Sequence, residues 1–191
     1  MKKLRYRYGC MTSGKSADLL ILAYSYENKG MNILVLKSSI DTRDKGYIKS
    51  RIGLSRECIR FTRDTNLREL VNKYNQQKRI DCVLVDESQF LTVEQVNQLL
   101  EVAVLDNINV TCYGLKVDYQ GKGFEGSNEL LALAHEVTEI PTPCKCGHKA
   151  THHLLKVNGE YRFSGEQINI GDTEFEVVCA ECYLKEKEKH K

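Results

Sequence analysis

Residues 9–16 read Gly9-Cys10-Met11-Thr12-Ser13-Gly14-Lys15-Ser16, and this segment is the strongest indication of the fold. It matches G-x-x-x-x-G-K-[ST], a loop whose backbone N–H groups surround the phosphates of a nucleotide. In such a loop the lysine reaches the β and γ oxygens, and the final hydroxyl binds Mg²⁺. Apolar residues at helical spacing follow it, so the loop opens onto the positive N-terminal end of a helix. We therefore predict that residues 9–16 bind a nucleoside triphosphate.

Two kinds of apolar pattern alternate through the first part of the chain. Short runs typical of strands lie at 4–8, 32–36, 82–85, 109–113 and 136–140. Amphipathic patterns typical of helices lie at 15–28, 66–76, 93–105 and 128–134. The third helix begins with a capping box formed by Thr92 and Gln95. This alternation predicts an α/β fold, a P-loop NTPase-type parallel sheet with flanking helices, in a domain of residues 1–140.

Two stretches do not follow this alternation. Residues 38–57 carry many charged side chains without an apolar face, and we expect a mobile excursion there. Residues 115–127 combine glycines with aromatic and charged side chains. Long irregular loops in a compact domain are usually functional, so both stretches are candidates for the site.

The composition is that of a soluble globular protein, with 41% hydrophobic and 28% charged residues. A net charge of +2 without a basic stripe gives no electrostatic case for binding nucleic acid or a membrane. No signal-peptide pattern is present, and no apolar stretch approaches the ~20 residues that cross a bilayer. We therefore expect a cytoplasmic protein.

The predicted strand at 82–85 continues into two carboxylates, Asp86 and Glu87. In P-loop enzymes an aspartate at this position lies beside the loop and helps to hold Mg²⁺, and we predict this role for Asp86. Glu87 then faces the crevice where an acceptor molecule would lie. A carboxylate there can accept the proton of an attacking hydroxyl. The alternative is that Glu87 only solvates the end of the strand.

Four of the eight cysteines form two close pairs near the C-terminus, Cys144 with Cys146 and Cys179 with Cys182. Four thiolates are a ligand set that Zn²⁺ adopts in structural sites. We predict a structural zinc site that stabilises a small C-terminal domain of residues 141–191. Two alternatives remain open at this point: His148 replaces one of the cysteines, or the cysteines form disulfides.

The other cysteines and histidines show no spacing that indicates chemistry. We expect Cys58, Cys82 and Cys112 to be small core hydrophobes, while Cys10 lies in the phosphate loop. The dipeptide Asn158-Gly159 favours a type I′ hairpin between two extended segments. Four histidines are predicted to lie at the surface or in packed positions without a catalytic or metal-binding role: His135, His152, His153 and His190.

Five motifs in one order resemble the type II (cytosolic-type) thymidine kinases: the loop at 9–16, Asp86-Glu87-Ser88-Gln89-Phe90, residues 114–121, residues 165–171 and the four cysteines. The resemblance runs from about residue 4 to residue 184. It implies a P-loop α/β domain with a small zinc-bound lasso domain. It also implies transfer of the γ-phosphate of ATP, with Mg²⁺, to the 5′-hydroxyl of thymidine. Members are homotetramers commonly inhibited by dTTP, so both properties are expected here.

The resemblance also implies roles for individual residues, with Glu87 as the proton acceptor. The residues expected to bind the cofactor ATP are Gly9, Cys10, Met11, Thr12, Ser13, Gly14, Lys15, Ser16, Asp86 and Gln89. Those expected to bind the nucleoside are Tyr119, Phe124, Gln167, Ile168, Asn169, Ile170, Gly171 and Phe175. Of these, residues 167–171 are expected to close over the nucleoside as a lid. Tyr119 stands where phenylalanine is usual, so its hydroxyl needs a partner. Arg43 and Arg51 are the candidates for neutralising charge in the transition state.

Three other functions share part of this pattern. A nucleic-acid-dependent ATPase with a zinc ribbon would need a basic face, which the net charge does not favour. A regulatory GTPase would need an Asn-Lys-x-Asp motif, which the sequence lacks. A kinase for another nucleoside would use the same chemistry. The sequence favours an ATP:thymidine 5′-phosphotransferase over all three.

Overall fold

The centre of the molecule is a parallel sheet of six strands. A computed structural model describes residues 1–42, 44, 46–167 and 174–190. The strand order is β5-β2-β6-β7-β1-β8, and every pair of neighbours is parallel. The strands are β1 (Leu4–Tyr8), β2 (Ile33–Ser38), β5 (Ile59–Phe61), β6 (Cys82–Asp86), β7 (Asn109–Gly114) and β8 (Glu136–Glu139). The α/β prediction is confirmed, although β5 was not among the predicted strands.

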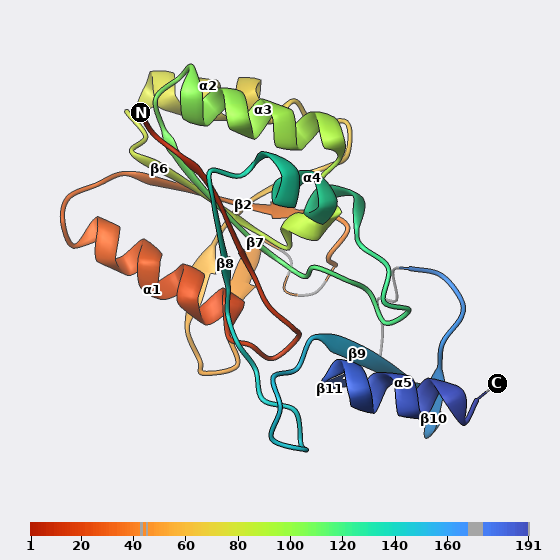
Figure 1. The fold of residues 1–191 in the computed structure, drawn as a ribbon. Helices are drawn as coiled ribbons and strands as arrows, with labels where there is room; N and C mark the ends of the chain where they lie inside the picture. The colour runs from red at the N-terminus through yellow and green to blue at the C-terminus, as the bar shows by residue number, and fades with distance from the viewer. Residues whose placement is uncertain (43, 45, 168–173, 191) are drawn as a thin grey trace.

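Helices cover both faces of this sheet (Figure 1). Helix α1 (Lys15–Glu27) lies on one face, and α2 (Leu67–Gln77), α3 (Val93–Val104) and α4 (Glu125–Leu133) lie on the other. The predicted capping box of α3 is present, because Thr92 and Gln95 each accept the other's backbone N–H. Helix α4 begins earlier than the sequence predicted, at Glu125 rather than at residue 128.

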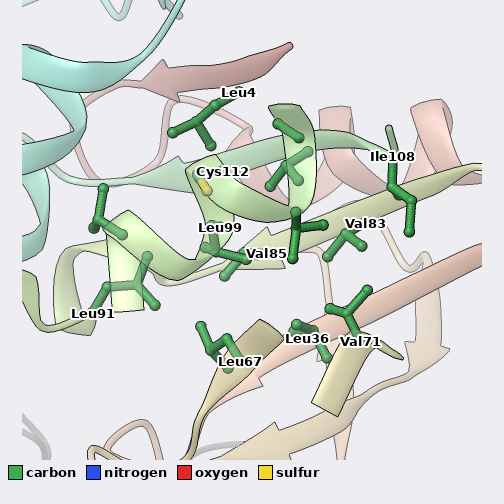
Figure 2. Close-up of a cluster of buried hydrophobic side chains, with 14 of the residues drawn as sticks. Leu4, Leu36, Leu67, Val71, Val83, Val85, Leu91, Leu99, Ile108 and Cys112 are labelled. Carbon is green, nitrogen blue, oxygen red and sulfur yellow. The ribbon is translucent and has the colours of Figure 1, made fainter. Parts of the chain in front are cut away.

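Two apolar clusters hold the sheet to its helices. The larger one lies between the sheet and α2, α3 and α4, and Figure 2 shows part of it, including Leu4, Leu36, Val83, Val85 and Leu99. The smaller one packs under α1 around Leu19, Val35, Leu84 and Tyr113. Cys82 and Cys112 are fully buried and Cys58 is half-buried beside the smaller cluster, so these thiols act as small core hydrophobes.

Much of the segment at 38–57 forms a β-hairpin, which corrects the prediction of a mobile excursion. Strand β3 (Tyr47–Lys49) pairs antiparallel with β4 (Ser55–Glu57), and Ile48 is fully buried. Arg56 donates two hydrogen bonds to Glu27 at the end of α1, which ties the hairpin to the helix. The sequence missed the hairpin because a three-residue strand with one buried side chain gives no periodic signal.

A second, smaller sheet follows the first. Its order is β10-β9-β11, and it consists of β9 (His152–Val157), β10 (Glu160–Arg162) and β11 (Glu174–Val178), with α5 (Ala180–Glu188) beside it (Figure 1). The turn between β9 and β10 has φ of 51° at Asn158 and 84° at Gly159, as a type I′ turn requires. Among the helices of the described residues, none combines the length and the apolar character needed to cross a membrane.

Candidate active site

A cavity of about 530 Å³ lies beyond the carboxyl ends of the central strands. Ligands of open parallel sheets bind at this edge because the loops that follow the strands meet there. The predicted site residues that line the cavity are Met11, Thr12, Gly14, Lys15, Ser16, Asp86, Glu87, Gln89, Tyr119, Phe124, Gln167 and Phe175. The phosphate loop, the acidic strand end and the residues expected at the nucleoside therefore meet in one cavity.

Other predicted residues lie behind the cavity or outside the described part of the chain. A Cβ at Gly9 would come within 2.7 Å of the Ile140 carbonyl oxygen, so this position needs glycine. Cys10 is buried in a cluster with the C-terminal cysteines. Ile168, Asn169, Ile170, Gly171 and Arg43 lie outside the described residues.

The phosphate loop turns sharply into α1. Thr12 and Gly14 have φ of 67° and 85°, and Lys15 Nζ donates to the carbonyls of Cys10 at 2.7 Å and Gly9 at 3.2 Å. The backbone N–H of Ser13 donates to the Cys10 carbonyl, and that of Met11 donates to His153. The amides nearest the start of α1 are therefore the best placed for phosphate oxygens.

The side of the cavity suited to a metal ion is formed by the first turn of α1 and the end of β6. Ser16 Oγ donates to Asp86 Oδ2 at 3.4 Å. Burial and the neighbouring Glu87 raise the pKa of the Asp86 carboxyl, and the charges of Lys37 and Lys15 oppose that rise. A hydroxyl beside a carboxylate is an oxygen set that fits Mg²⁺.

Glu87 is held in an unusual backbone conformation at the end of β6. Its φ of 52° is in the left-handed region, which costs about 1 kcal/mol or more for a residue with a side chain. Gln89 donates from Nε2 to Glu87 Oε2 at 2.5 Å and accepts at Oε1 from the Leu115 backbone N–H at 3.1 Å. Both ends of the Gln89 amide thus have protein partners, although the sequence assigned this residue to the cofactor. Gln89 fixes the Glu87 carboxylate against the next loop.

That next loop, residues 115–124, is here named the nucleoside loop. Tyr119 is 2% exposed, and its hydroxyl donates to the Glu166 carbonyl at 3.0 Å, which supplies the partner that the tyrosine needs. Phe124 packs edge-on against Phe90, with ring centroids 6.2 Å apart. Asp118 accepts from Gln167 Nε2 at 3.0 Å, so the described end of the predicted lid is attached to the nucleoside loop.

Sequence reasoning missed a buried ion pair in the cavity wall. Lys37 Nζ lies 3.0 Å from Asp41 Oδ2, and the two side chains are 5% and 3% exposed. Lys37 lies opposite Asp86 in the register between β2 and β6. The signal was its place at the carboxyl end of a predicted strand, the same place that singled out Asp86. Arg51, one of the two candidate arginines, also lines the cavity.

The four C-terminal cysteines come together as predicted. The sulfur atoms of Cys144, Cys146, Cys179 and Cys182 all lie within 4.8 Å of one another. A tetrahedral Zn²⁺ with Zn–S bonds of 2.3 Å places its ligands about 3.8 Å apart, so the cluster fits this ion. The thiols are free rather than disulfide-bonded. His148 Nδ1 lies 3.4 Å from Cys146 Sγ, beside this four-sulfur group.

The charges within this cluster also favour a cation. Backbone N–H groups of Cys146 and Cys179 lower the pKa of the Cys144 thiol. Hydrogen bonds with the neighbouring thiols Cys146 and Cys179 raise the pKa of Cys182 to about 12. Four thiolates without a cation would repel one another, and a divalent ion between them removes that cost.

A phosphate loop at the carboxyl edge of a parallel sheet, with an acidic strand end beside it, defines a P-loop nucleotide-binding protein. A family model described as thymidine kinase matches residues 2–183. The chain belongs to the thymidine kinase family.

Curated relatives cover nearly the whole chain. A thymidine kinase of Photorhabdus laumondii is 42% identical over 97% of this chain and 94% of its own. One of Enterobacteria phage T4 is 44% identical over 94% of each chain. One of Rhodopirellula baltica is 45% identical over 94% of this chain and 86% of its own. Among solved structures, Pif1 helicase from Candida albicans matches at a TM-score of 0.44 and 15% identity, over 73% of this chain and 36% of that chain, too weak a likeness to carry weight.

Proposed function

We propose that this protein transfers the γ-phosphate of ATP to the 5′-hydroxyl of thymidine, with Glu87 as proton acceptor. Membership of the thymidine kinase family supports the reaction. The observation that carries the assignment of residues is the single cavity that joins the phosphate loop, Glu87 and the nucleoside loop.

ATP binds with its phosphates on the loop at 9–16. Lys15 releases the carbonyls of Gly9 and Cys10 and turns to the β and γ oxygens. Ser16 and Asp86 would hold Mg²⁺, which neutralises phosphate charge when it is bound. Support for these roles comes from the Ser16–Asp86 contact and from the side chain of Ser13, whose buried hydroxyl has no hydrogen-bond partner among the described residues.

Glu87 accepts the proton of the thymidine 5′-hydroxyl. As the oxygen bonds to the γ-phosphorus, the bond to the β–γ bridging oxygen breaks and ADP leaves with the electron pair. The left-handed backbone and the bond from Gln89 fix the carboxylate before substrate arrives. Arg51 is the described candidate for neutralising charge that develops on the phosphoryl group.

The base lies between the nucleoside loop and the predicted lid. Tyr119 stacks on thymine and Phe124 contributes a second aromatic surface. The family resemblance implies that residues 167–171 close over the nucleoside; of these, only Gln167 is among the described residues, and it is anchored to Asp118. Phe175, also expected at the nucleoside, lines the cavity. Closure excludes water, which would otherwise accept the phosphate.

The remaining proposals concern organisation and regulation. Residues 1–140 form the nucleotide-binding domain, and residues 141–191 form a lasso domain stabilised by structural Zn²⁺ on the four cysteines. The protein assembles as a homotetramer and is inhibited by dTTP, as its family resemblance implies. Its free thiols suit a reducing compartment, and we place it in the cytoplasm.

Incubation with ATP, Mg²⁺ and each of the four deoxynucleosides tests the proposal. We expect thymidine to be phosphorylated with the highest kcat/KM. Preference for another deoxynucleoside would contradict thymidine as the substrate but would still support phosphate transfer from ATP to a 5′-hydroxyl. ATP hydrolysis that is stimulated by DNA and needs no nucleoside would contradict the proposed function as a whole.

A further inference from the structure

His153 on β9 is a histidine that the proposed reaction does not use. Its ring is 2% exposed and lines the cavity, although it belongs to the small C-terminal sheet. Its Nε2 accepts the backbone N–H of Met11 in the phosphate loop at 2.9 Å. The backbone of Val117 in the nucleoside loop also acts on this ring as a hydrogen-bond partner that raises its pKa. One imidazole therefore joins both substrate-binding loops to the C-terminal sheet.

The two hydrogen bonds assign the tautomer of His153. Because Nε2 accepts from Met11, Nδ1 must carry the proton that is donated to Val117. A neutral ring is required, since an imidazolium has no acceptor. Burial lowers the pKa of His153 to about 4, and the charges of Lys15 and His152 act in the same direction. The ring is therefore neutral over the range in which enzymes of this kind work.

Both loops depend on polar interactions with the His153 ring. The Met11 N–H donates to this ring in a part-buried position, and the loss of its acceptor would leave it without that partner at the start of the phosphate loop. Val117 pairs with Gly123 in an isolated bridge that closes the nucleoside loop. A shift of Val117 would therefore move the strand segment that precedes Tyr119.

We propose that His153 is a positioning residue that fixes the phosphate loop and the nucleoside loop relative to each other, so that ATP and the nucleoside bind in register. This inference rests on the proposed function of the cavity. His153 touches neither reacting group directly and acts through Met11 and Val117.

Two substitutions test the interactions of His153 with Met11 and with Val117 one at a time. In His153→Asn the side-chain amide reaches the place of Nδ1, so it keeps the bond to Val117 and loses the bond to Met11. In His153→Gln the amide oxygen reaches the place of Nε2, so it keeps the bond to Met11 and loses the bond to Val117. Dissociation constants for MgATP and for thymidine are measured separately by calorimetry, together with kcat and the melting temperature.

We expect a crossed result, in which each variant weakens the binding of one ligand and leaves the other unaffected. His153→Asn weakens MgATP binding about tenfold and leaves thymidine binding close to wild type, which is the size of effect expected for one part-buried hydrogen bond. His153→Gln weakens thymidine binding about tenfold and leaves MgATP binding close to wild type. A residue with only a structural role would lower the melting temperature without this crossing.

His135 provides the matched control. Its Nδ1 accepts the backbone N–H of Leu4 at 3.1 Å, the same kind of bond at the opposite end of the sheet from the cavity. His135→Asn and His135→Gln should leave both dissociation constants unchanged.

Equal losses for both ligands in both His153 variants, or affinities equal to wild type, would overturn the positioning role. A wild-type protein that binds MgATP but not thymidine would contradict the proposed function. In that case the difference in MgATP affinity between His153→Asn and His153→Gln still decides the role of His153.

Discussion

The six-stranded sheet and the three-stranded sheet are stabilised in different ways. The first lies over an extensive cluster of buried aliphatic side chains contributed by strands and helices. The second has a small cluster in which Cys10, Cys144 and Cys179 take the place of large apolar residues. So small a core supplies little stability without a further constraint, and the four-cysteine cluster, which could hold a zinc ion, is the candidate for that constraint. The large sheet thus has its own core, whereas we expect the small one to depend on zinc and on its contacts with the loops at Met11 and Tyr119.

Zinc removal should have the largest effect, and it should affect the two sheets differently. Chelation should unfold the region around β9, β10, β11 and α5 while the six-stranded sheet persists, because structural zinc contributes about 10–16 kcal/mol of apparent binding free energy. Hydrogen exchange by mass spectrometry reads both regions at once. Equal loss of protection in β6 and β9, or a metal analysis that finds no zinc, would contradict the proposed difference in stability between the two sheets.

Replacement of Glu87 by Gln tests the chemistry that the larger sheet provides. The amide cannot accept the 5′-hydroxyl proton, so kcat should fall about 10²- to 10⁴-fold while MgATP binding is kept. Steady-state kinetics and calorimetry measure the two effects. The control is Glu136→Gln, since Glu136 pairs with Lys3 and Arg5 far from the cavity. Turnover close to wild type in Glu87→Gln would remove the role as base.

Replacement of Leu99 by Ala tests the stability of the larger sheet. Leu99 is fully buried, so the cavity left behind should lower the free energy of unfolding by about 2–5 kcal/mol. Leu184 on α5 is 56% exposed, and Leu184→Ala should change stability by less than about 0.5 kcal/mol. Urea unfolding measures both. A small effect at Leu99 would contradict the view that the buried aliphatic cluster stabilises the six-stranded sheet.

Replacement of Tyr119 by Phe should have the smallest effect. It removes the bond to the Glu166 carbonyl, one of the links from the nucleoside loop to the segment after β10, at a cost of about 1 kcal/mol. We expect KM for thymidine to rise about fivefold at nearly constant kcat. Tyr183→Phe, which removes the bond from α5 to the Tyr119 carbonyl, should act in the same direction. A large loss of kcat in Tyr119→Phe would mean that its hydroxyl takes part in the reaction.

Elements of the central sheet and its helices could be predicted where residues adjacent in the sequence form a recognisable pattern. Strands such as 82–85 are continuous apolar runs, and the capping box at Thr92 is a pattern of adjacent residues. Strand β5 was missed because it is three residues long. The hairpin at β3 and β4 was missed for the same reason, and because charged side chains surround Ile48.

Some residues of the site are revealed by a local sequence motif, and others are not. The sequence singled out the phosphate loop, the Asp86–Glu87 pair and the four cysteines, since each is a compact motif. The structure brings the loop and the acidic pair to one cavity and the four sulfur atoms together. The sequence predicted a cofactor role for Gln89, which stays a prediction; in the structure Gln89 lines the cavity and its amide is hydrogen-bonded to Glu87 and to the Leu115 backbone. It gave His153 no role, because a histidine in a strand has no motif that reveals its partners.

Periodicity and short motifs are enough to predict the nucleotide-binding class, the parallel sheet and the capacity for zinc, because each depends on residues that are close along the chain. Packing of the folded chain alone reveals that Lys37 and Asp41 form a buried pair in the cavity wall and that His153 accepts a hydrogen bond from Met11 in the phosphate loop. Such contacts link residues that are distant along the chain. They depend on how sheets and loops pack against each other, and no local pattern specifies that packing.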